Sequence, residues 1–401
     1  MIKNTLNQVL LILLLSFLIG SASSIFLLGL DFVQTIRPRL SSLWLLLPFT
    51  AILFQWIKKS FPGLHHTGTN QFIEQVQEQE KKTFPFFSVY ILVSTWLSHL
   101  AGASVGREGT AVQLGASISE QLSTIFPKSP EQKSIWLRAG MAAGFASVFG
   151  TPLAGTLFGL EISTVGKISY KSFFPCLLTS FGANWVSLHV YHTKHTIYPA
   201  VFLPELNLAF WLNLSILAAF LSLLAYVYKA LESNIFYLSE QLPKHFILKG
   251  IISGFLIYGL LNLPGFHSSV GLSADQLLVP FQKNISSHFF IQKLTATAAS
   301  LGLGFKGGEA TPLFLIGSHG AAFLSNFISM PSTLAAAIGF VALYCGLAKT
   351  PLTGMLLGME LFSNQAWFIY LLVTIFVMFF SGKNGLFKQQ QWADYLPKPL
   401  Y

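Results

Sequence analysis

The sequence predicts an all-α integral membrane protein, and two features of its composition carry this prediction. Of its 401 residues, 53% are hydrophobic and only 10% are charged, whereas a soluble chain carries about 25% charged residues. Apolar runs recur along the whole chain, and a helix that crosses a bilayer needs about 20 apolar residues. Because the polar stretches between these runs are short, we expect a single membrane domain over residues 1–401 and no C-terminal regulatory domain.

The apolar runs fall into two classes by length. Runs long enough to span a membrane lie near residues 8–30, 87–106, 140–165, 203–228, 246–264, 290–305 and 366–380. Shorter runs, interrupted by glycine and proline, lie at 43–57, 173–190, 311–330 and 351–361. We expect the shorter runs to form half-helices packed among other helices, because they are too short to span. The net charge of +9 is typical of basic cytoplasmic loops, which could also attract anions to a pore mouth; we predict no nucleic-acid partner.

The chain contains an internal repeat. TPLAGTLFGLEI at residues 151–162 matches TPLTGMLLGMEL at residues 350–361 in seven of twelve positions. Upstream, GREGTAV (106–112) aligns with GGEATPL (307–313), which places Glu108 opposite Glu309. Two matched blocks in register predict halves of approximately residues 1–200 and 201–401. Such a repeat with broken apolar segments is typical of a secondary transporter with a central binding site.

The breaks in the repeated segments predict an anion site. Irregular backbone at membrane depth is tolerated only where it is buried or lines a cavity. Each break begins a half-helix whose first N–H groups have no partner within the helix and whose dipole favours negative charge. We expect such helix starts near Gly68, Gly106, Gly307 and Thr350. Their convergence would bind an anion without a full positive charge.

Glu108 is the residue whose position most needs an explanation. A carboxylate at bilayer depth costs a few kcal/mol or more unless it is paired, solvated or protonated. Facing helix N-termini, it would occupy the place of an inorganic anion, and a displaced or desolvated carboxylate takes up a proton. One side chain can therefore compete with an anion and carry a proton, which predicts anion–proton exchange. The alternative is that Glu108 only pairs with Arg107 or caps a helix.

These segments resemble the CLC family of anion channels and proton-coupled antiporters over nearly the full chain. GREGT (106–110) is similar to the family's GREGP segment, which carries the gating glutamate, and residues 139–162 are similar to its FNAPLAGxLFxxEE region. The resemblance implies a CLC-like fold of two inverted repeats with broken, tilted helices. It also implies a multi-pass protein of the cell (inner) membrane, a homodimer with one pathway per subunit, and Glu108 as the gating and proton-transfer residue.

Three details resemble the fluoride/proton antiporter branch, CLC-F. The fifth position of the gating motif is Thr110 rather than proline, and GFKGGEATPLF (304–314) places Glu309 as in that branch. The stretch HTGTNQ (66–71) stands where the chloride branch has GSGIP. We therefore expect fluoride to be exchanged for protons. The alternative is a chloride/proton antiporter or a voltage-gated-type chloride channel of the same family.

Two positions depart from the family pattern. The stretch NGLFKQQ (384–390) has Phe387 where a tyrosine usually faces the anion, and Ile162 replaces the second glutamate of the EE pair, a proton relay in chloride exchangers. A phenylalanine cannot donate an O–H, although its ring edge is electropositive.

The resemblance and the helix-start argument together predict an anion-binding set of Gly68, Thr69, Asn70, Gly106, Arg107, Gly109, Thr110, Gly308, Glu309, Thr311 and Phe387.

Some of these residues could have a purely structural role instead of binding the anion. Asn70 could donate its amide to the anion or act as an ordinary N-cap, and Glu309 and Thr311 could line the site or cap the helix that they open. Glu161 and Glu360, which close the repeated blocks, are expected to stabilise helix ends rather than carry protons.

A function of another class would be a membrane enzyme that uses Glu108 and Glu309 as an acid/base pair. No convincing nucleophile, metal set or phosphate clamp accompanies these glutamates, so we predict that the protein is not an enzyme. His192 and His195 have a metal-like spacing but lie in a short loop without an acidic or thiol partner. We therefore expect no metal site and no cofactor.

Overall fold

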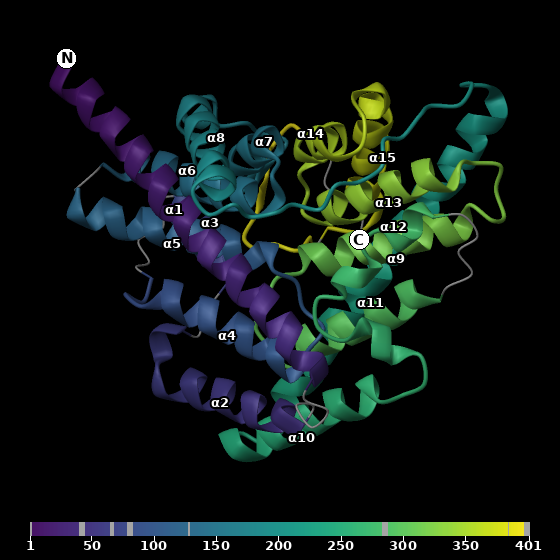
Figure 1. Ribbon diagram of the computed structural model, residues 1–401, viewed down its shortest axis with the longest axis horizontal. Coiled ribbons are helices and arrows are strands. Elements are labelled where there is room, and N and C mark those ends of the chain that lie inside the picture. The colour runs from purple at the N-terminus through teal and green to yellow at the C-terminus, as the bar shows by residue number, and fades with distance from the viewer. Residues whose placement is uncertain are drawn as a thin grey trace.

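Two helices, α1 (Ile2–Ile36) and α9 (Leu208–Gln241), are long and apolar enough to cross a membrane. They belong to a computed structural model that describes residues 2–39, 45–64, 68–77, 83–126, 129–282, 288–383 and 385–396. Each begins one half of the chain, and α1 runs diagonally across the molecule in Figure 1. In these ranges the other apolar helices are shorter than a full span.

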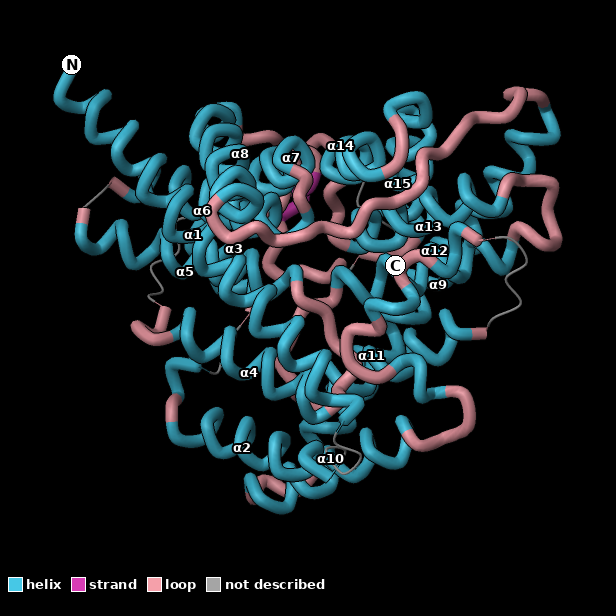
Figure 2. Tube along the Cα trace, viewed as in Figure 1, coloured by secondary structure: helices cyan, strands magenta, loops and turns pink. Residues whose placement is uncertain are grey.

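Most of the runs that suggested full spans form shorter helices. In the run at 140–165, glycine and proline interrupt the helix. Gly150 has a left-handed φ of 74° and ends α6 (Pro130–Phe149), and Pro152 begins α7 (Pro152–Glu161). Figure 2 shows loops that reach the middle of the molecule between helices, which is where half-helices begin.

The helices of the two halves follow one another in the same order. After α1, the first half contains α2 (Leu46–Ser60), α4 (Phe87–Ala101), α5 (Glu108–Ile125), α6, α7 and α8 (Phe173–His189). After α9, the second contains α10 (Phe246–Leu261), α11 (Phe289–Gly302), α12 (Ala310–Leu324), α13 (Ser332–Leu347), α14 (Pro351–Leu361) and α15 (Trp367–Phe380). The eight-residue α3 (Thr69–Val76) has no counterpart in the described part of the second half.

Matching helix pairs pack in the same way in both halves. In α5 and α6, a Cβ atom on Gly115 would lie 2.0 Å from the carbonyl oxygen of Gly140. In α12 and α13, a Cβ atom on Gly317 would lie 2.0 Å from the carbonyl oxygen of Gly339. Only glycine permits such close approach of two helix backbones. The repeat is therefore present in packing as well as in sequence.

The remaining elements are short. Strand β1 (Thr164–Val165) pairs in parallel with β2 (Gln391–Trp392) and ties the C-terminal segment to the end of α7. The same segment is held where Gln390 Nε2 donates to the carbonyl oxygens of Ile162 and Ala348, at 2.9 and 2.8 Å. Single 3₁₀ turns lie at Arg37–Arg39, Pro62–Leu64, Tyr170–Ser172, Phe266–Ser269, Ala274–Gln276, Val279–Phe281 and Asn364–Ala366.

Each half caps a broken helix of the other half. The Glu161 carboxylate at the end of α7 accepts the N–H groups of Leu352 (3.0 Å) and Thr353 (2.7 Å) and the Thr353 hydroxyl (2.7 Å) at the start of α14. The Glu360 carboxylate at the end of α14 accepts the N–H groups of Leu153 (3.0 Å) and Ala154 (2.8 Å) at the start of α7. Helices α7 and α14 lie side by side in Figure 1.

These caps confirm that Glu161 and Glu360 stabilise helix ends. They also make one expectation wrong, namely that the helix beginning at Thr350 contributes a free N-terminus to an anion site. Its first N–H groups are already satisfied by the buried Glu161 carboxylate. A carboxylate that fills a helix N-terminus removes the unpaired donors on which anion binding depends.

Removal of the buried cap should destabilise the fold. Glu161→Ala leaves three donors of α14 without an acceptor, so we expect the free energy of unfolding to fall by about 2 kcal/mol. The measurement is thermal unfolding of the purified protein in detergent. The control is Glu131→Ala, which removes an exposed pair with Lys171 and should leave the midpoint nearly unchanged. Equal midpoints for the two variants would contradict the capping role.

Candidate functional site

The segments that precede α5 and α12 cross at the centre of the protein. Gly106 N donates to Gly308 O at 2.6 Å, and Gly308 N donates to Gly106 O at 2.8 Å. A Cβ atom on Gly106 would lie 2.7 Å from Cδ of Pro312, and one on Gly109 would lie 3.0 Å from Cα of Gly308. Glycine is therefore required by the close approach of the two segments. The crossing brings together the N-termini of the two repeated half-helices.

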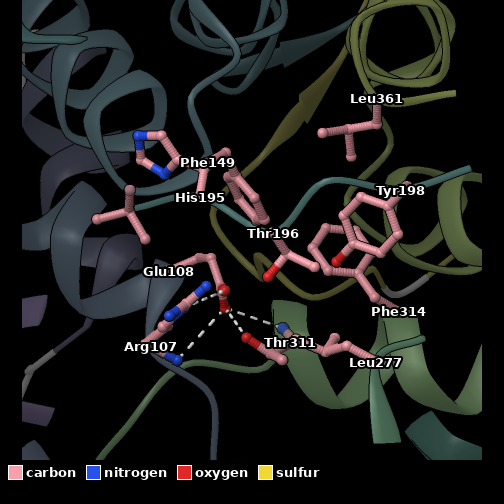
Figure 3. Close-up of a pocket in the computed structure, with 11 residues that line it drawn as sticks. Arg107, Glu108, Phe149, His195, Thr196, Tyr198, Leu277, Thr311, Phe314 and Leu361 are labelled. Carbon is pink, nitrogen blue, oxygen red and sulfur yellow. Dashed lines mark hydrogen bonds and ion pairs between the residues drawn. The ribbon is translucent and has the colours of Figure 1, made fainter. Parts of the chain in front are cut away.

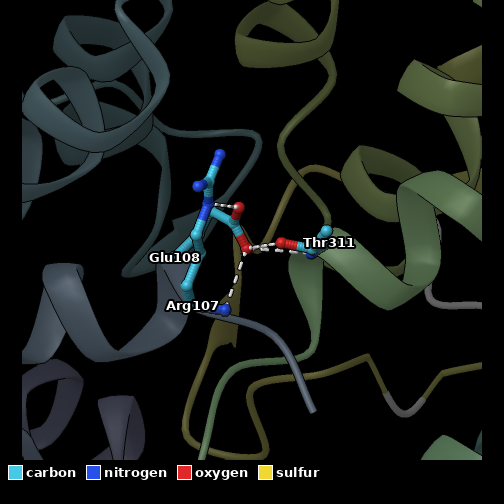
Figure 4. Close-up of polar contacts among 3 residues, drawn as sticks. All are labelled: Arg107, Glu108 and Thr311. Atoms are coloured by element: carbon cyan, nitrogen blue, oxygen red, sulfur yellow. Dashed lines mark hydrogen bonds and ion pairs between the residues drawn. The ribbon is translucent and has the colours of Figure 1, made fainter. Parts of the chain in front are cut away.

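Glu108, the first residue of α5, places its carboxylate on the N-terminus of α12 (Figure 4). Its Oε2 accepts the N–H of Thr311 at 2.9 Å and also the Thr311 hydroxyl. Its Oε1 accepts Nε–H of Arg107 at 3.2 Å, and the Arg107 backbone N–H lies 3.3 Å from Oε2. The Glu108 side chain is buried. The carboxylate thus occupies a helix N-terminus, which is where an anion binds.

A small pocket lies on one side of Glu108 (Figure 3), and we call it the narrow pocket. The loop between α8 and α9 crosses this side of the molecule and contributes His195, Thr196 and Tyr198. None of the three was predicted as an anion-site residue: His195 was considered only as a metal ligand, and Thr196 and Tyr198 belong to no motif. The full lining is Arg107, Glu108, Val148, Phe149, His195, Thr196, Tyr198, Leu277, Thr311, Phe314 and Leu361.

A second space of about 450 Å³, the wide cavity, brings together most of the other predicted residues. Gly68, Thr69, Asn70, Gly109, Gly308, Glu309 and Phe387 all line it. Glu108 faces the narrow pocket while Gly109, the next residue, lines the wide cavity. The N-terminus of α5 therefore separates the two spaces. Five lysines also line the wide cavity: Lys58, Lys229, Lys249, Lys306 and Lys388.

The α3 helix starts at the wide cavity, as the sequence predicts. Gly68 is its N-cap and has a φ of 129°, a conformation that favours glycine. Asn70 therefore lies inside the helix and is not the N-cap, which rules out one of its two interpretations. Its Oδ1 accepts the backbone N–H of Gln389 at 3.3 Å. Two residues of the motif, His66 and Thr67, lie outside the described residues.

Thr110 and Phe387 differ in their relation to the two spaces. The Thr110 hydroxyl lies 2.8 Å from the hydroxyl of Thr95 in α4, and the Thr110 side chain is fully buried in this helix contact. It lines neither the narrow pocket nor the wide cavity. Phe387 lines the wide cavity and meets the ring of Phe158 edge-on, with centroids 6.5 Å apart. Asn384, in the same motif, lies outside the described residues.

Glu309 is the N-cap residue of α12, but its side chain makes no capping hydrogen bond. The capping alternative is therefore wrong for Glu309, whereas Thr311 uses its N–H and hydroxyl to hold Glu108. The hydroxyl of Tyr228 donates a long hydrogen bond, 3.5 Å, to Oε2 of Glu309. Tyr228 belongs to α9 and was not predicted as a site residue. The same apolar run contains a lysine and a glutamate three positions apart, Lys229 and Glu232. This charged pair was the sequence feature that could have indicated a role for Tyr228.

Comparison with known proteins identifies one family. A family model described as voltage gated chloride channel matches residues 49–381. The chain is 33% identical over 389 residues to a chloride/fluoride channel protein of Pseudomonas syringae pv. tomato, and the alignment covers 94% of this chain and 85% of the relative.

Solved structures agree as well. The crystal structure of a CLC-type fluoride/proton antiporter superposes with a TM-score of 0.92 at 28% identity, and the match covers 98% of this chain and 100% of the other. A slow cyanobacterial Cl⁻/H⁺ antiporter matches with a TM-score of 0.75 at 22% identity, covering 93% and 94% of the two chains; this second likeness concerns the fold alone.

The predicted family and fold class are thus confirmed. The family model spans more than three quarters of the chain, and the relative and the structures extend the match to nearly all of it. With Glu108 held at the crossing of two half-helix starts, this chain belongs to the CLC family of membrane anion channels and transporters.

Proposed function

We propose that the protein exchanges fluoride for protons across the membrane, with Glu108 as the gating and proton-carrying carboxylate. The observation that carries this proposal is the position of the Glu108 carboxylate on the N-terminus of α12, between the narrow pocket and the wide cavity. The likeness to a CLC-type fluoride/proton antiporter and to a chloride/fluoride channel protein supports fluoride as the anion.

Competition for one set of donors explains the coupling. The N–H and hydroxyl of Thr311 and the N–H and Nε–H of Arg107 serve one anionic group at a time. When Glu108 is ionised, it holds these donors and excludes an inorganic anion. A proton neutralises the carboxyl and weakens its charge-assisted hydrogen bonds, so the neutral side chain leaves more readily and a fluoride ion takes the donors. Anion entry and proton uptake are thereby linked at one carboxylate.

The charges of the wide cavity support an orientation in the membrane. Its five lysines are what the cytoplasmic side of a membrane protein contains in excess, so the wide cavity is assigned to the cytoplasm and the narrow pocket to the opposite side. Lysines at a cavity mouth raise the local concentration of anions. In this orientation an inward proton gradient expels cytoplasmic fluoride. The expected location is the inner membrane, and the expected assembly is a homodimer with one pathway per subunit.

Selectivity separates this proposal from the other candidate, chloride exchange or conduction. The segment at α3 lacks the chloride branch's GSGIP sequence and places Asn70 in the wide cavity. In liposomes loaded with either anion, we expect fluoride efflux to be much faster than chloride efflux and to be accompanied by proton uptake. The measurement is ion-selective electrode recording together with external pH. Equal rates for the two anions would favour the chloride function.

Glu108→Gln keeps the shape of the side chain but removes its titration. We expect proton movement to stop. Fluoride release should slow by at least about tenfold, because the site loses an anionic competitor whose hydrogen bonds are worth about 1.5–3 kcal/mol. The readout is proton uptake driven by a fluoride gradient in liposomes. Glu120→Gln is the matched control, since Glu120 is a buried glutamate of the same helix that binds Thr83. Uphill proton movement in the Glu108→Gln variant would show that Glu108 does not couple the two ions.

Asn70→Ala tests the amide at the start of α3. If the amide donates to the anion, its loss should reduce the ratio of fluoride to chloride transport by about five- to tenfold, the value of one hydrogen bond. The ratio is measured in the same liposome assay. Asn213→Ala is the control, because Asn213 binds Ser329 at an exposed position far along the chain. An unchanged ratio in a folded Asn70 variant would limit Asn70 to its contact with Gln389.

A further inference from the structure

Helix α9 is apolar over most of its length but carries a charged pair that lines the wide cavity. Lys229 and Glu232 line the wide cavity, and Lys229 Nζ donates to Oε2 of Glu232 at 2.7 Å. The Lys229 side chain is only 10% exposed, and a lysine so deeply buried requires a compensating anion. The short distance shows that Glu232 supplies it.

A second carboxylate faces the same pair from α12. Glu309 lines the same cavity, accepts the long hydrogen bond from Tyr228, and interacts electrostatically with both Lys229 and Glu232. One buried ammonium is thus shared by two carboxylates. With both carboxylates ionised, the cluster would carry an excess negative charge in a cavity through which an anion must pass.

Two like charges that interact in one buried site favour the protonation of one carboxylate. The geometry decides which one. Glu232 makes the direct contact with Lys229, whereas Glu309 has only the long contact with a neutral phenol. Glu309 is therefore the carboxylate of the cluster without a direct cation contact, and it is the group that gains an O–H from water in the cavity and returns that proton to the water.

Other titratable groups also line the wide cavity, and two of them, Lys388 and Tyr344, interact electrostatically with Glu309. Lys58 and Lys249 both contact Glu240, at 3.6 and 3.0 Å, and Lys388 lies 5.3 Å from the ring of Phe236. The remaining titratable groups of the described lining are Glu74, Tyr90 and Lys306. Among the described residues, the contact between Lys229 and Glu232 is the one ion pair that involves a member of this cluster.

We infer that Lys229 and Glu232 are positioning residues that set the pH dependence of transport from the wide-cavity side through their charges beside Glu309. This inference rests on the proposed fluoride/proton exchange and adds to it a control of proton exchange on that side. The pair acts through Glu309 and does not itself need to contact the anion.

Two substitutions should move the pH profile in opposite directions. Glu232→Gln releases the Lys229 charge to Glu309, so Glu309 should protonate at lower pH and the pH midpoint of fluoride efflux should fall by about one unit. Lys229→Met removes the cation, and the midpoint should rise by about one unit. The measurement is fluoride efflux from liposomes with oriented protein, with pH varied on the wide-cavity side and held constant on the other.

Lys229→Arg keeps the charge and should keep the midpoint of the unmodified protein. Lys249→Met is the control for a lysine lost from the same cavity and should also leave the midpoint unchanged. The inference would be overturned if the pH midpoint shifted in the same direction in both variants, or if it did not shift in Glu232→Gln. If Lys229→Met fails to fold, Glu232→Gln alone decides the question. Fluoride movement without protons in the unmodified protein would overturn the proposed exchange and this inference together, whereas coupled exchange with unshifted variants overturns the inference alone.

Discussion

The paired backbone hydrogen bonds between Gly106 and Gly308 are the contact on which the rest of the site depends. They hold two irregular segments against each other at a depth where unpaired backbone would be costly. Because neither residue has a side chain, the N-terminus of α12 comes within reach of Glu108 at the N-terminus of α5. A side chain at either position would separate the repeats and remove the donors from the carboxylate.

One type of interaction, a carboxylate on the N-terminus of a half-helix, occurs three times between the two halves within the described residues. Glu161 and Glu360 close α14 and α7, and Glu108 closes α12. Glu161 and Glu108 even use similar donors, the N–H and hydroxyl of a threonine in the first turn. The difference lies in the surroundings: Glu108 opens on the narrow pocket and can exchange with a mobile anion. The other two caps hold the halves together.

The wide cavity combines lysines with carboxylates, and this mixture suits a path for two ions of opposite charge. The lysines attract anions, and their ion pairs with Glu232 and Glu240 limit how strongly any one lysine retains them. A cavity lined by cations alone would bind an anion too tightly for release. Glu309, without a direct cation partner among the described contacts, is left as the group whose charge can vary.

The sequence alone determined the class of fold, the repeat and Glu108, because these depend on composition, on glycine and proline positions and on one short motif. It also predicted seven of the residues that share the wide cavity. Only the tertiary structure decided which helix starts are open, because Thr353 at the start of α14 meets a carboxylate 192 positions away in the other half. It also decided that Tyr228 meets Glu309, 81 positions away within the second half. Local pattern carries no information about such pairs, because the packing of distant helices, rather than either segment, brings them into contact.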